Sequence, residues 1–249
     1  MLTKDEAICI RTVDYSETSQ VVTFFGRTSG KLSAIAKGSK RPKSAFEGPV
    51  EVLAHGAIVF SDSNRERLAT LTEFSQQSHF RNLSGNLYAL NCCLLGAELV
   101  GSLTDEYDPH PTLFESFLQF LRDAGSLKAG DNSNKDVLAM LVAFELTLLR
   151  EIGLQPVLNA CANCKTAYRT EWTQCHFSST SNGLICRDCE GSFSEKVRLS
   201  RAAADCLAEL KTILRASRDT LKEVERVLIY HFTGLLHKRP RMADYVLHC

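Results

Sequence analysis

The sequence predicts an α+β protein built from several small domains, and three observations support this. The first 75 or so residues are rich in β-branched and aromatic residues, helical spacing begins after Arg81, and two Cys-x₂-Cys pairs interrupt the helical part. A chain of 249 residues fits one to three small domains. Its apolar residues, 44% of the total, are enough to bury cores and argue against global disorder.

Five short strands are predicted in the first part of the chain. They cover residues 7–13, 20–26, 31–37, 50–61 and 68–74, and turn-forming residues separate them at 14–16, 28–30 and 38–49. Because no helical pattern lies between them, we expect a small closed barrel or a sandwich. An OB-type barrel has this number of strands, but the number alone does not select it.

The remainder of the chain shows the apolar spacing of helices. The first apolar stripe runs from Leu83 to Leu99, and Thr112 with Glu115 forms a capping-box pattern at the start of a second helix. Residues 124–135 are polar and rich in Gly, Ser and Asn, which predicts a loop. Further helices are expected over residues 137–149, ended by Gly153 and Pro156, over 201–214 after a Ser200 cap, and over 221–236.

Composition also limits the compartment and the class of partner. Lys+Arg and Asp+Glu are both 29, so the formal net charge is zero, which excludes a uniformly basic polyanion-binding protein. The N-terminus lacks the apolar region of a signal peptide, and the apolar runs are far shorter than a bilayer requires. We therefore expect a soluble cytoplasmic protein with reduced thiols and no membrane contact, in which paired cysteines are metal ligands or redox centres.

The strongest chemical signal is a pair of Cys-x₂-Cys motifs, Cys161 with Cys164 and Cys186 with Cys189, separated by 21 residues. Two such knuckles complete a tetrahedral Zn–S₄ shell, so the sequence predicts one structural Zn²⁺. The alternative is four unrelated reduced cysteines, and Cys175 or His176 could replace one ligand. A redox role fits poorly because no βαβ pattern surrounds either pair, and a catalytic role fits poorly because four thiolates leave no open position.

A basic segment lies in the first domain. Between Glu17 and Glu47 there is no acidic residue, and the interval carries six cations: Arg27, Lys31, Lys37, Lys40, Arg41 and Lys43. Such a patch suits contacts to nucleic-acid phosphates, which give affinity without reading sequence. The alternative is a solvated loop whose charges serve solubility. A stacking platform for single strands would also need exposed aromatic residues. Phe24, Phe25 and Phe46 are near the basic segment, but Phe24 or Phe25 must face the core.

Two further patterns favour a binding protein. Residues 82–120 contain no Lys or Arg but five acids, which biases nucleic acid towards the first domain. The seven histidines lie in no recognisable motif with a Ser or Asp partner, and Gly-x-Ser-x-Gly and His-Glu-x-x-His are absent. The sequence therefore favours a protein that is not an enzyme.

Taken together, these motifs resemble the bacterial RecO family of recombination mediators over essentially the whole chain. The resemblance lies in residues 15–19, 30–31 and 37–44 of the first domain, in 109–114, and most specifically in 144–149, 153–156 and 161–164. It continues through residues 176–178, 183–189 and 199–200. The family often has two glycines before the second cysteine pair, where this chain has Asn182-Gly183.

The resemblance implies an N-terminal OB-fold and a helical C-terminal domain into which a zinc finger is inserted. On this basis we expect an OB-fold domain at residues 1–80, a helical domain at 81–158 and 193–249, and the finger at 159–192. The resemblance also implies binding of single- and double-stranded DNA, annealing of complementary strands, and loading of the recombinase onto DNA coated by single-strand-binding protein. The family partners would be RecR and single-strand-binding protein, and the location would be the bacterial cytoplasm at the nucleoid.

Our hypothesis is that Lys37, Lys40, Arg41 and Lys43 bind DNA phosphates, with Arg27 and Lys31 extending the surface. The competing hypothesis is a zinc-stabilised interaction module that acts through protein partners without direct DNA binding.

Overall fold

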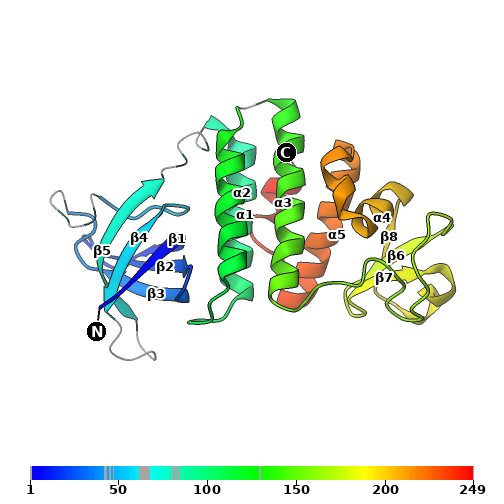
Figure 1. The fold of residues 1–249 in the computed structure, drawn as a ribbon, viewed down its shortest axis with the longest axis horizontal. Coiled ribbons are helices and arrows are strands. Elements are labelled where there is room, and N and C mark those ends of the chain that lie inside the picture. The colour runs from blue at the N-terminus through cyan, green and yellow to red at the C-terminus, as the bar shows by residue number, and fades with distance from the viewer. Residues whose placement is uncertain are drawn as a thin grey trace. The chain divides into compact units, whose positions relative to one another are not determined.

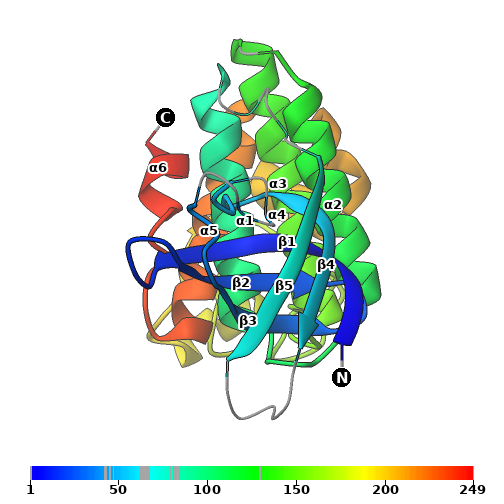
Figure 2. The ribbon, with the colours of Figure 1, turned by 90° about the vertical axis from the view of Figure 1, so that its left-hand side faces the viewer.

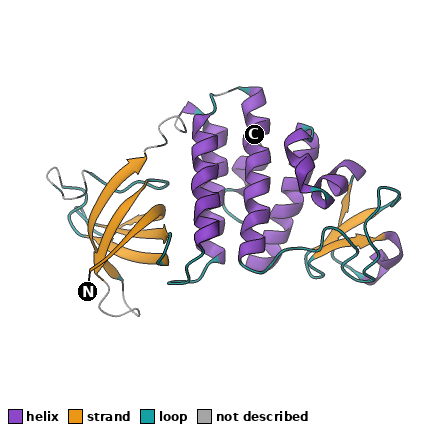
Figure 3. Ribbon diagram, viewed as in Figure 1, coloured by secondary structure: helices purple, strands orange, loops and turns teal. Residues whose placement is uncertain are grey.

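The computed structural model describes residues 2–41, 44, 46, 48–61, 68–78, 80, 83, 85–128 and 130–248. Strands come first in the chain, helices follow, and a small second sheet interrupts the helical part (Figures 1 and 3). The chain divides into two compact units, which are Met1–Gly85 with Gly96–Ser126 and Asn86–Leu95 with Leu127–Cys249. The domain boundaries expected from the sequence stay predictions.

The first five strands form a closed barrel in the order β1-β2-β3-β5-β4, which confirms the expected OB-type barrel. They are β1 (Leu2–Asp14), β2 (Gln20–Gly26), β3 (Gly30–Ala36), β4 (His55–Ser61) and β5 (Ala69–Ser78). Neighbours are antiparallel except β3 and β5, which are parallel. Figure 2 shows β1, β2 and β3 crossed by β4 and β5.

The length of β1 lets the barrel close. Its first half pairs with β4, from Leu2 to Ile8, and its second half pairs with β2, from Ala7 to Asp14. A bulge between Cys9 and Arg11 marks the change of register, and bulges of this kind bend a strand towards its second neighbour. The inward side chains, among them Phe24, Leu32 and Ile58, fill the interior.

The strands differ from the sequence prediction mainly at their ends. The second strand has the predicted bounds, whereas β1 begins at Leu2 instead of residue 7. The prediction placed the start of β4 at residue 50, but the strand starts at His55. Residues 51–54 form a turn, in which Leu53 has a left-handed backbone (φ 70°) and Ala54 N donates to Glu51 O. The turn still bonds to β1, because Leu53 N donates to Cys9 O (2.7 Å) and Cys9 N donates to Ala54 O (2.8 Å).

Two helical segments belong to the same unit as the barrel. They are the end of α1 (Leu87–Leu103) and all of α2 (Pro111–Ser126). The ring of Phe114 on α2 lies 6.1 Å from that of Phe25 on β2. The predicted capping box was wrong, because α2 begins at Pro111 and Thr112 therefore lies inside its first turn. Proline suits this first position, since its missing N–H would have no helical partner there.

Helix α5 is the central helix of the second unit. Its helical elements are α3 (Asp131–Glu151), α4 (Arg201–Ala208), η3 (Leu210–Arg215), α5 (Arg218–Leu236) and α6 (Ala243–Leu247). Helix α5 packs against α3, α4 and α6. The predicted cap is confirmed, because Ser200 Oγ accepts a hydrogen bond of 3.1 Å from Ala203 N.

Three helical predictions need correction. The loop predicted at residues 124–135 is much shorter, since α2 continues to Ser126 and α3 already begins at Asp131. The helix after Ser200 stops at Ala208, and a 3₁₀ turn carries Leu210 and Leu214. The sequence prediction missed α6. Among the described residues, no helix combines the length and apolar character needed to cross a membrane.

Two acidic side chains are buried in the helical core of the second unit. Glu145 on α3 and Glu225 on α5 are both fully buried, and no other described residue donates a hydrogen bond to their oxygens. Burial raises the pKa of Glu145 well above its usual value, and it raises the pKa of Glu225 to about 7. The nearest titratable neighbours, Cys92 and Tyr88 on α1, also have raised pKa values because of burial. Burial therefore favours the protonated form of both carboxyl groups, and ionising them inside the core destabilises the folded protein.

This arrangement predicts that stability falls as the pH rises from acid to mild alkali. Both pKa values lie above that of an unfolded glutamate, about 4.3, so the contribution is complete below that pH. It is lost as the pH rises to the folded pKa, about 7 for Glu225 and higher for Glu145. The expected slope is about 1.4 kcal/mol per pH unit for each carboxyl that must release a proton. Urea unfolding at pH 6 and pH 8.5 measures it. A Glu145→Gln/Glu225→Gln variant should have a flatter profile, whereas Glu209→Gln at an exposed site should match the wild type. An unchanged profile in the double variant would contradict this assignment.

Candidate metal centre and basic loop

The two cysteine pairs are brought together by backbone pairing between distant segments. Val157 N donates to Asn182 O (2.9 Å), Leu184 N donates to Val157 O (2.9 Å), and Ala162 N donates to Leu184 O (2.7 Å). This close approach needs a glycine at position 183, because a Cβ there would lie 2.5 Å from Val157 O. The pairing sets the first knuckle beside the strand that leads into the second.

A small three-stranded sheet carries the second knuckle. Its strands are β6 (Cys175–Ser178), β7 (Gly183–Cys186) and β8 (Val197–Leu199), in the order β7-β6-β8. The second cysteine pair spans the end of β7 and the 3₁₀ helix η2 (Arg187–Ser192). The first pair lies in a turn closed by Lys165 N donating to Cys161 O (3.0 Å), with Lys165 in the left-handed region (φ 62°).

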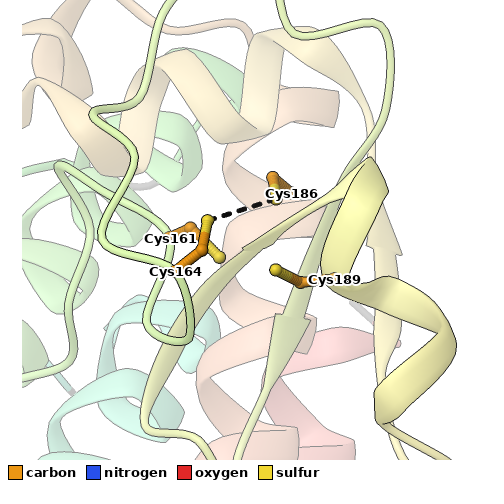
Figure 4. Close-up of side chains that lie close together, drawn as sticks. All are labelled: Cys161, Cys164, Cys186 and Cys189. Carbon is orange, nitrogen blue, oxygen red and sulfur yellow. Dashed lines mark hydrogen bonds between the residues drawn. The ribbon is translucent and has the colours of Figure 1, made fainter.

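The four cysteines predicted as ligands converge on one point. The sulfur atoms of Cys161, Cys164, Cys186 and Cys189 all lie within 4.8 Å of one another (Figure 4). Zn–S bonds of about 2.3 Å at tetrahedral angles give sulfur–sulfur edges of about 3.8 Å. The Sγ atoms of Cys164 and Cys186 are 3.7 Å apart, and all nine cysteines of the described residues are free thiols. The side chains therefore fit a four-sulfur metal shell.

The surroundings of the cluster stabilise thiolates unevenly. Asn163 Nδ2 donates a hydrogen bond of 3.3 Å to Cys189 Sγ. Hydrogen bonds from Thr166 lower the pKa of Cys164 to about 6, and burial raises the pKa of Cys186 to about 12. A bound divalent metal would hold all four sulfurs as thiolates, since ligand cysteines must be deprotonated.

The two alternative ligands have other partners. Cys175 lies outside the cluster, and its Sγ is directed at His176 O (3.8 Å). His176 Nδ1 lies 3.0 Å from the carboxylate of Glu190. Within the residues that the structure describes, the four-cysteine group is the one cluster of His, Cys, Asp and Glu that meets metal-site geometry.

The cysteines also make up most of the finger's own core. The buried cluster consists of the cysteines at 161, 186 and 189 with Ile185, and Trp172 and Phe193 pack against it half-buried. So few apolar groups cannot compensate the entropy of ordering this segment, and a metal ion would supply the missing free energy.

The five described cations of the basic segment fall into two groups. Arg27 is paired inside the first unit: its Nη2 lies 3.1 Å from Glu6 and 2.5 Å from Glu115, and its guanidinium lies 5.3 Å from the centre of the Phe114 ring. Its charge is thus offset by two carboxylates.

Lys31 also has internal partners. Its Nζ donates to the carbonyl oxygens of Gly101 (2.9 Å) and Thr104, at the end of α1. A cation at a helix C-terminus satisfies free carbonyls and the helix dipole. Burial lowers the pKa of this lysine, and the charges of Glu106 and Asp105 oppose that shift. Both residues thus have internal partners, through which Lys31 contacts the end of α1 and Arg27 contacts α2, and their predicted role in DNA binding stays a prediction.

Lys37, Lys40 and Arg41 lie at the surface instead, on the loop that follows β3. Arg41 N donates to Gly38 O (3.0 Å) and closes a turn over these residues. Lys40 Nζ lies 2.7 Å from Asp14, in an exposed ion pair that contributes little. The fourth predicted cation, Lys43, lies outside the described residues.

The start of this loop is fixed by buried polar side chains. Gln20 Oε1 accepts from Ser39 Oγ (3.0 Å) and Val50 N (3.0 Å), and Ser19 Oγ accepts from Gly38 N (3.1 Å). Ser19, Gln20 and Ser39 are all buried. The exposed cations are therefore presented from a turn anchored to β2, and these anchors were not predicted from the sequence.

Comparison with known families decides the relationship. The model of the recombination protein O N-terminal domain matches residues 1–80, and that of its C-terminal domain matches residues 84–243. The chain belongs to the RecO family. The two matches cover both the barrel with its basic loop and the helical part with the cysteine cluster.

Individual RecO relatives agree with this assignment. The DNA repair protein RecO of Rhodopirellula baltica is 34% identical over 82% of this chain and 73% of its own length. That of Bacillus subtilis is 33% identical over 98% of this chain and 94% of its own. The DNA repair protein RecO of Halalkalibacterium halodurans is 30% identical over 98% of this chain and 95% of its own length. The resemblance expected from the sequence motifs is confirmed.

The close approach at Gly183 predicts a metal-loading defect that leaves every ligand intact. Gly183→Ala would push Val157 away and separate the two knuckles, so the purified variant should hold well under one metal equivalent per chain. Gly191→Ala is the matched control, because nothing lies within 4 Å of that position and its loading should be normal. Elemental analysis of both proteins measures the difference, and full loading of the Gly183 variant would contradict the role given to the backbone pairing.

Proposed function

We propose that this chain is a non-enzymatic DNA-binding recombination mediator of DNA repair. The observation that carries the proposal is the anchored turn of exposed cations at Lys37, Lys40 and Arg41 on an OB-type barrel. Family membership supports it, because the curated relatives are named as DNA repair proteins.

The DNA-binding surface consists of Lys37, Lys40, Arg41 and Lys43. Phosphate contacts from such a loop are independent of base sequence, as a protein that acts on any damaged region requires. When two DNA strands lie close to this loop at once, its positive charges reduce the repulsion between the phosphates of the two strands, which favours annealing.

The remaining parts of the proposal rest on the family. We propose that the chain anneals complementary strands and helps load the recombinase onto DNA coated by single-strand-binding protein. RecR and single-strand-binding protein are the proposed protein partners, and the cytoplasm at the nucleoid is the proposed location.

We further propose that the metal of the four-cysteine cluster is Zn²⁺ in a structural role. Four thiolates suit this ion, and a complete tetrahedral shell leaves no position for substrate. The residues that would hold it are Cys161, Cys164, Cys186 and Cys189, three of them buried. The ion contributes folding free energy and no reaction step.

Neutralising the loop tests the DNA surface. A variant with Lys37, Lys40, Arg41 and Lys43 all replaced by Gln should bind oligonucleotides at least about tenfold more weakly at low salt. The slope of log K against log salt should fall by about one for each lost phosphate contact. Fluorescence anisotropy at two or more salt concentrations measures both quantities.

A matched variant separates local from global charge effects. Lys128, Lys211, Arg215 and Lys238 are exposed cations outside the barrel, so replacing all four by Gln changes the net charge equally. This control should keep most of its affinity. Equal affinity and slope in the loop variant and the wild type would overturn the proposed DNA surface. Wild-type protein that binds its protein partners but no DNA would favour the interaction module instead.

Removing a ligand tests the metal assignment. Cys161→Ser and Cys186→Ser should each lose the bound zinc and expose the finger to proteolysis while the barrel still unfolds at its normal denaturant concentration. Cys206→Ser is the control, since Cys206 is buried in α4 away from the cluster. Elemental analysis and limited proteolysis provide the readouts, and stoichiometric zinc in both ligand variants would refute the assignment.

A further inference from the structure

One exposed aromatic residue lies beside the basic loop. Tyr15 is 66% exposed, at the tip of the β1–β2 hairpin. Phe24, Phe25 and Phe46 are unsuitable for stacking on DNA bases, because all three side chains are buried. Among the described residues, Tyr15 and Tyr245 are the aromatic side chains that stand out as exposed, and Tyr245 lies in the other unit on α6.

The hairpin tip and the basic loop form one hydrogen-bonded framework. Lys40 N donates to Thr18 O (3.1 Å), and Gly38 N donates to Ser19 Oγ (3.1 Å). Lys40 Nζ lies 2.7 Å from the carboxylate of Asp14, the residue before Tyr15. The hairpin tip is the dark blue loop that extends to one side of the barrel in Figure 2.

The tip is itself ordered. Tyr15 N and Ser16 N both donate to Ser19 O, at 3.0 and 3.2 Å. The backbone of Tyr15 is therefore held in place while its ring remains in solvent. A large aromatic ring that stays exposed does not contribute the hydrophobic stabilisation that burial would give the folded protein. A ring held in this way therefore suits a binding surface.

The charged residues around Tyr15 give this end of the barrel a net positive charge, which suits a nucleic-acid strand. Asp14 is offset by Lys40, and Glu17 is one exposed acid. The exposed cations Arg11, Lys37 and Arg41 outweigh it. Phosphates are therefore attracted to the same end of the barrel at which the ring is exposed.

We propose that Tyr15 stacks on an unpaired base of single-stranded DNA whose phosphates contact the basic loop. This inference rests on the proposed DNA binding and gives it a strand preference. The bases of an intact duplex already cover one another, so an aromatic ring gains a stacking partner only on unpaired bases. A cationic loop alone would not distinguish the two forms in this way.

The experiment compares single-stranded and duplex oligonucleotides of one length by fluorescence anisotropy at a fixed salt concentration. Tyr15→Ala should bind single strands about 5- to 150-fold more weakly, corresponding to about 1–3 kcal/mol for one stacked base. Its duplex affinity should stay within about twofold, and its salt slope should be unchanged because no phosphate contact is lost.

Two variants identify the ring as the cause. Tyr15→Phe keeps the ring and should bind single strands like the wild type. Tyr245→Ala removes a tyrosine of similar exposure (60%) from the other unit and should bind like the wild type as well. The stacking assignment is overturned if Tyr15→Phe binds single strands as weakly as Tyr15→Ala does. It is also overturned if Tyr15→Ala loses single-strand and duplex affinity to the same extent.

A fluorescence measurement keeps the test valid even if Tyr15→Ala is poorly folded. The chain has one tryptophan, Trp172, so a Tyr15→Trp variant adds a second whose signal is obtained by subtracting the wild-type emission. Single-stranded DNA should quench the added tryptophan, and duplex DNA should not. Absence of quenching at saturating single strand overturns the inference.

The outcomes also separate this inference from the function on which it depends. Wild-type single-strand affinity in Tyr15→Ala, with weakened binding in the loop variant, would refute the stacking and leave the DNA surface standing. Unchanged binding in the loop variant would refute the DNA surface itself.

Discussion

The proposed DNA-binding end of the barrel depends on the pairing of one long strand, β1, with two neighbours. Because β1 joins β4 along its first half and β2 along its second, the sheet closes, and the far end of β1 becomes a hairpin tip. That tip holds the loop after β3 through Thr18 and Ser19. Both the cationic turn and the exposed ring are therefore placed by backbone pairing in the barrel.

The cations of the barrel's unit differ in how far they are buried and in what they contact. Cations that approach the helices have internal partners: Arg27 pairs with two carboxylates, and Lys31 donates hydrogen bonds to helix carbonyls. Beyond the end of β3, Lys40 forms an exposed pair with Asp14, whereas Lys37 and Arg41 remain in solvent, where counterions surround them until a polyanion displaces these ions. A neutral protein can thus present a locally positive surface without spreading positive charge over the molecule.

Local features were predictable from the sequence, and features that depend on distant partners were not. The two Cys-x₂-Cys motifs predicted the converging sulfurs because the spacing itself shapes each knuckle. The basic segment predicted six similar cations, yet two of them bind internally to groups far along the chain, Glu115 and Gly101 among them.

The same distinction applies to the misassigned elements. Polarity at residues 124–135 indicated a loop, although α3 uses several of those polar residues in its first turns. Glu145 and Glu225 follow helical spacing like ordinary surface acids, and only the packing of α3 against α5 buries them. Tyr15 belongs to residues 15–19, one of the stretches that resemble the family, but its exposure is a property of the folded hairpin.

The strand order of the finger has a consequence for its removal. The incoming chain at Val157 lies beside β7, the outgoing strand is β8, and β6 lies between them, so entry and exit are three strand spacings apart. At about 4.8 Å per spacing this is about 14 Å, which about five extended residues would span. A short linker would therefore join the two ends without stretching the helices on either side, but it would uncover α5, because Phe177 and Ser179 at β6 pack against His231.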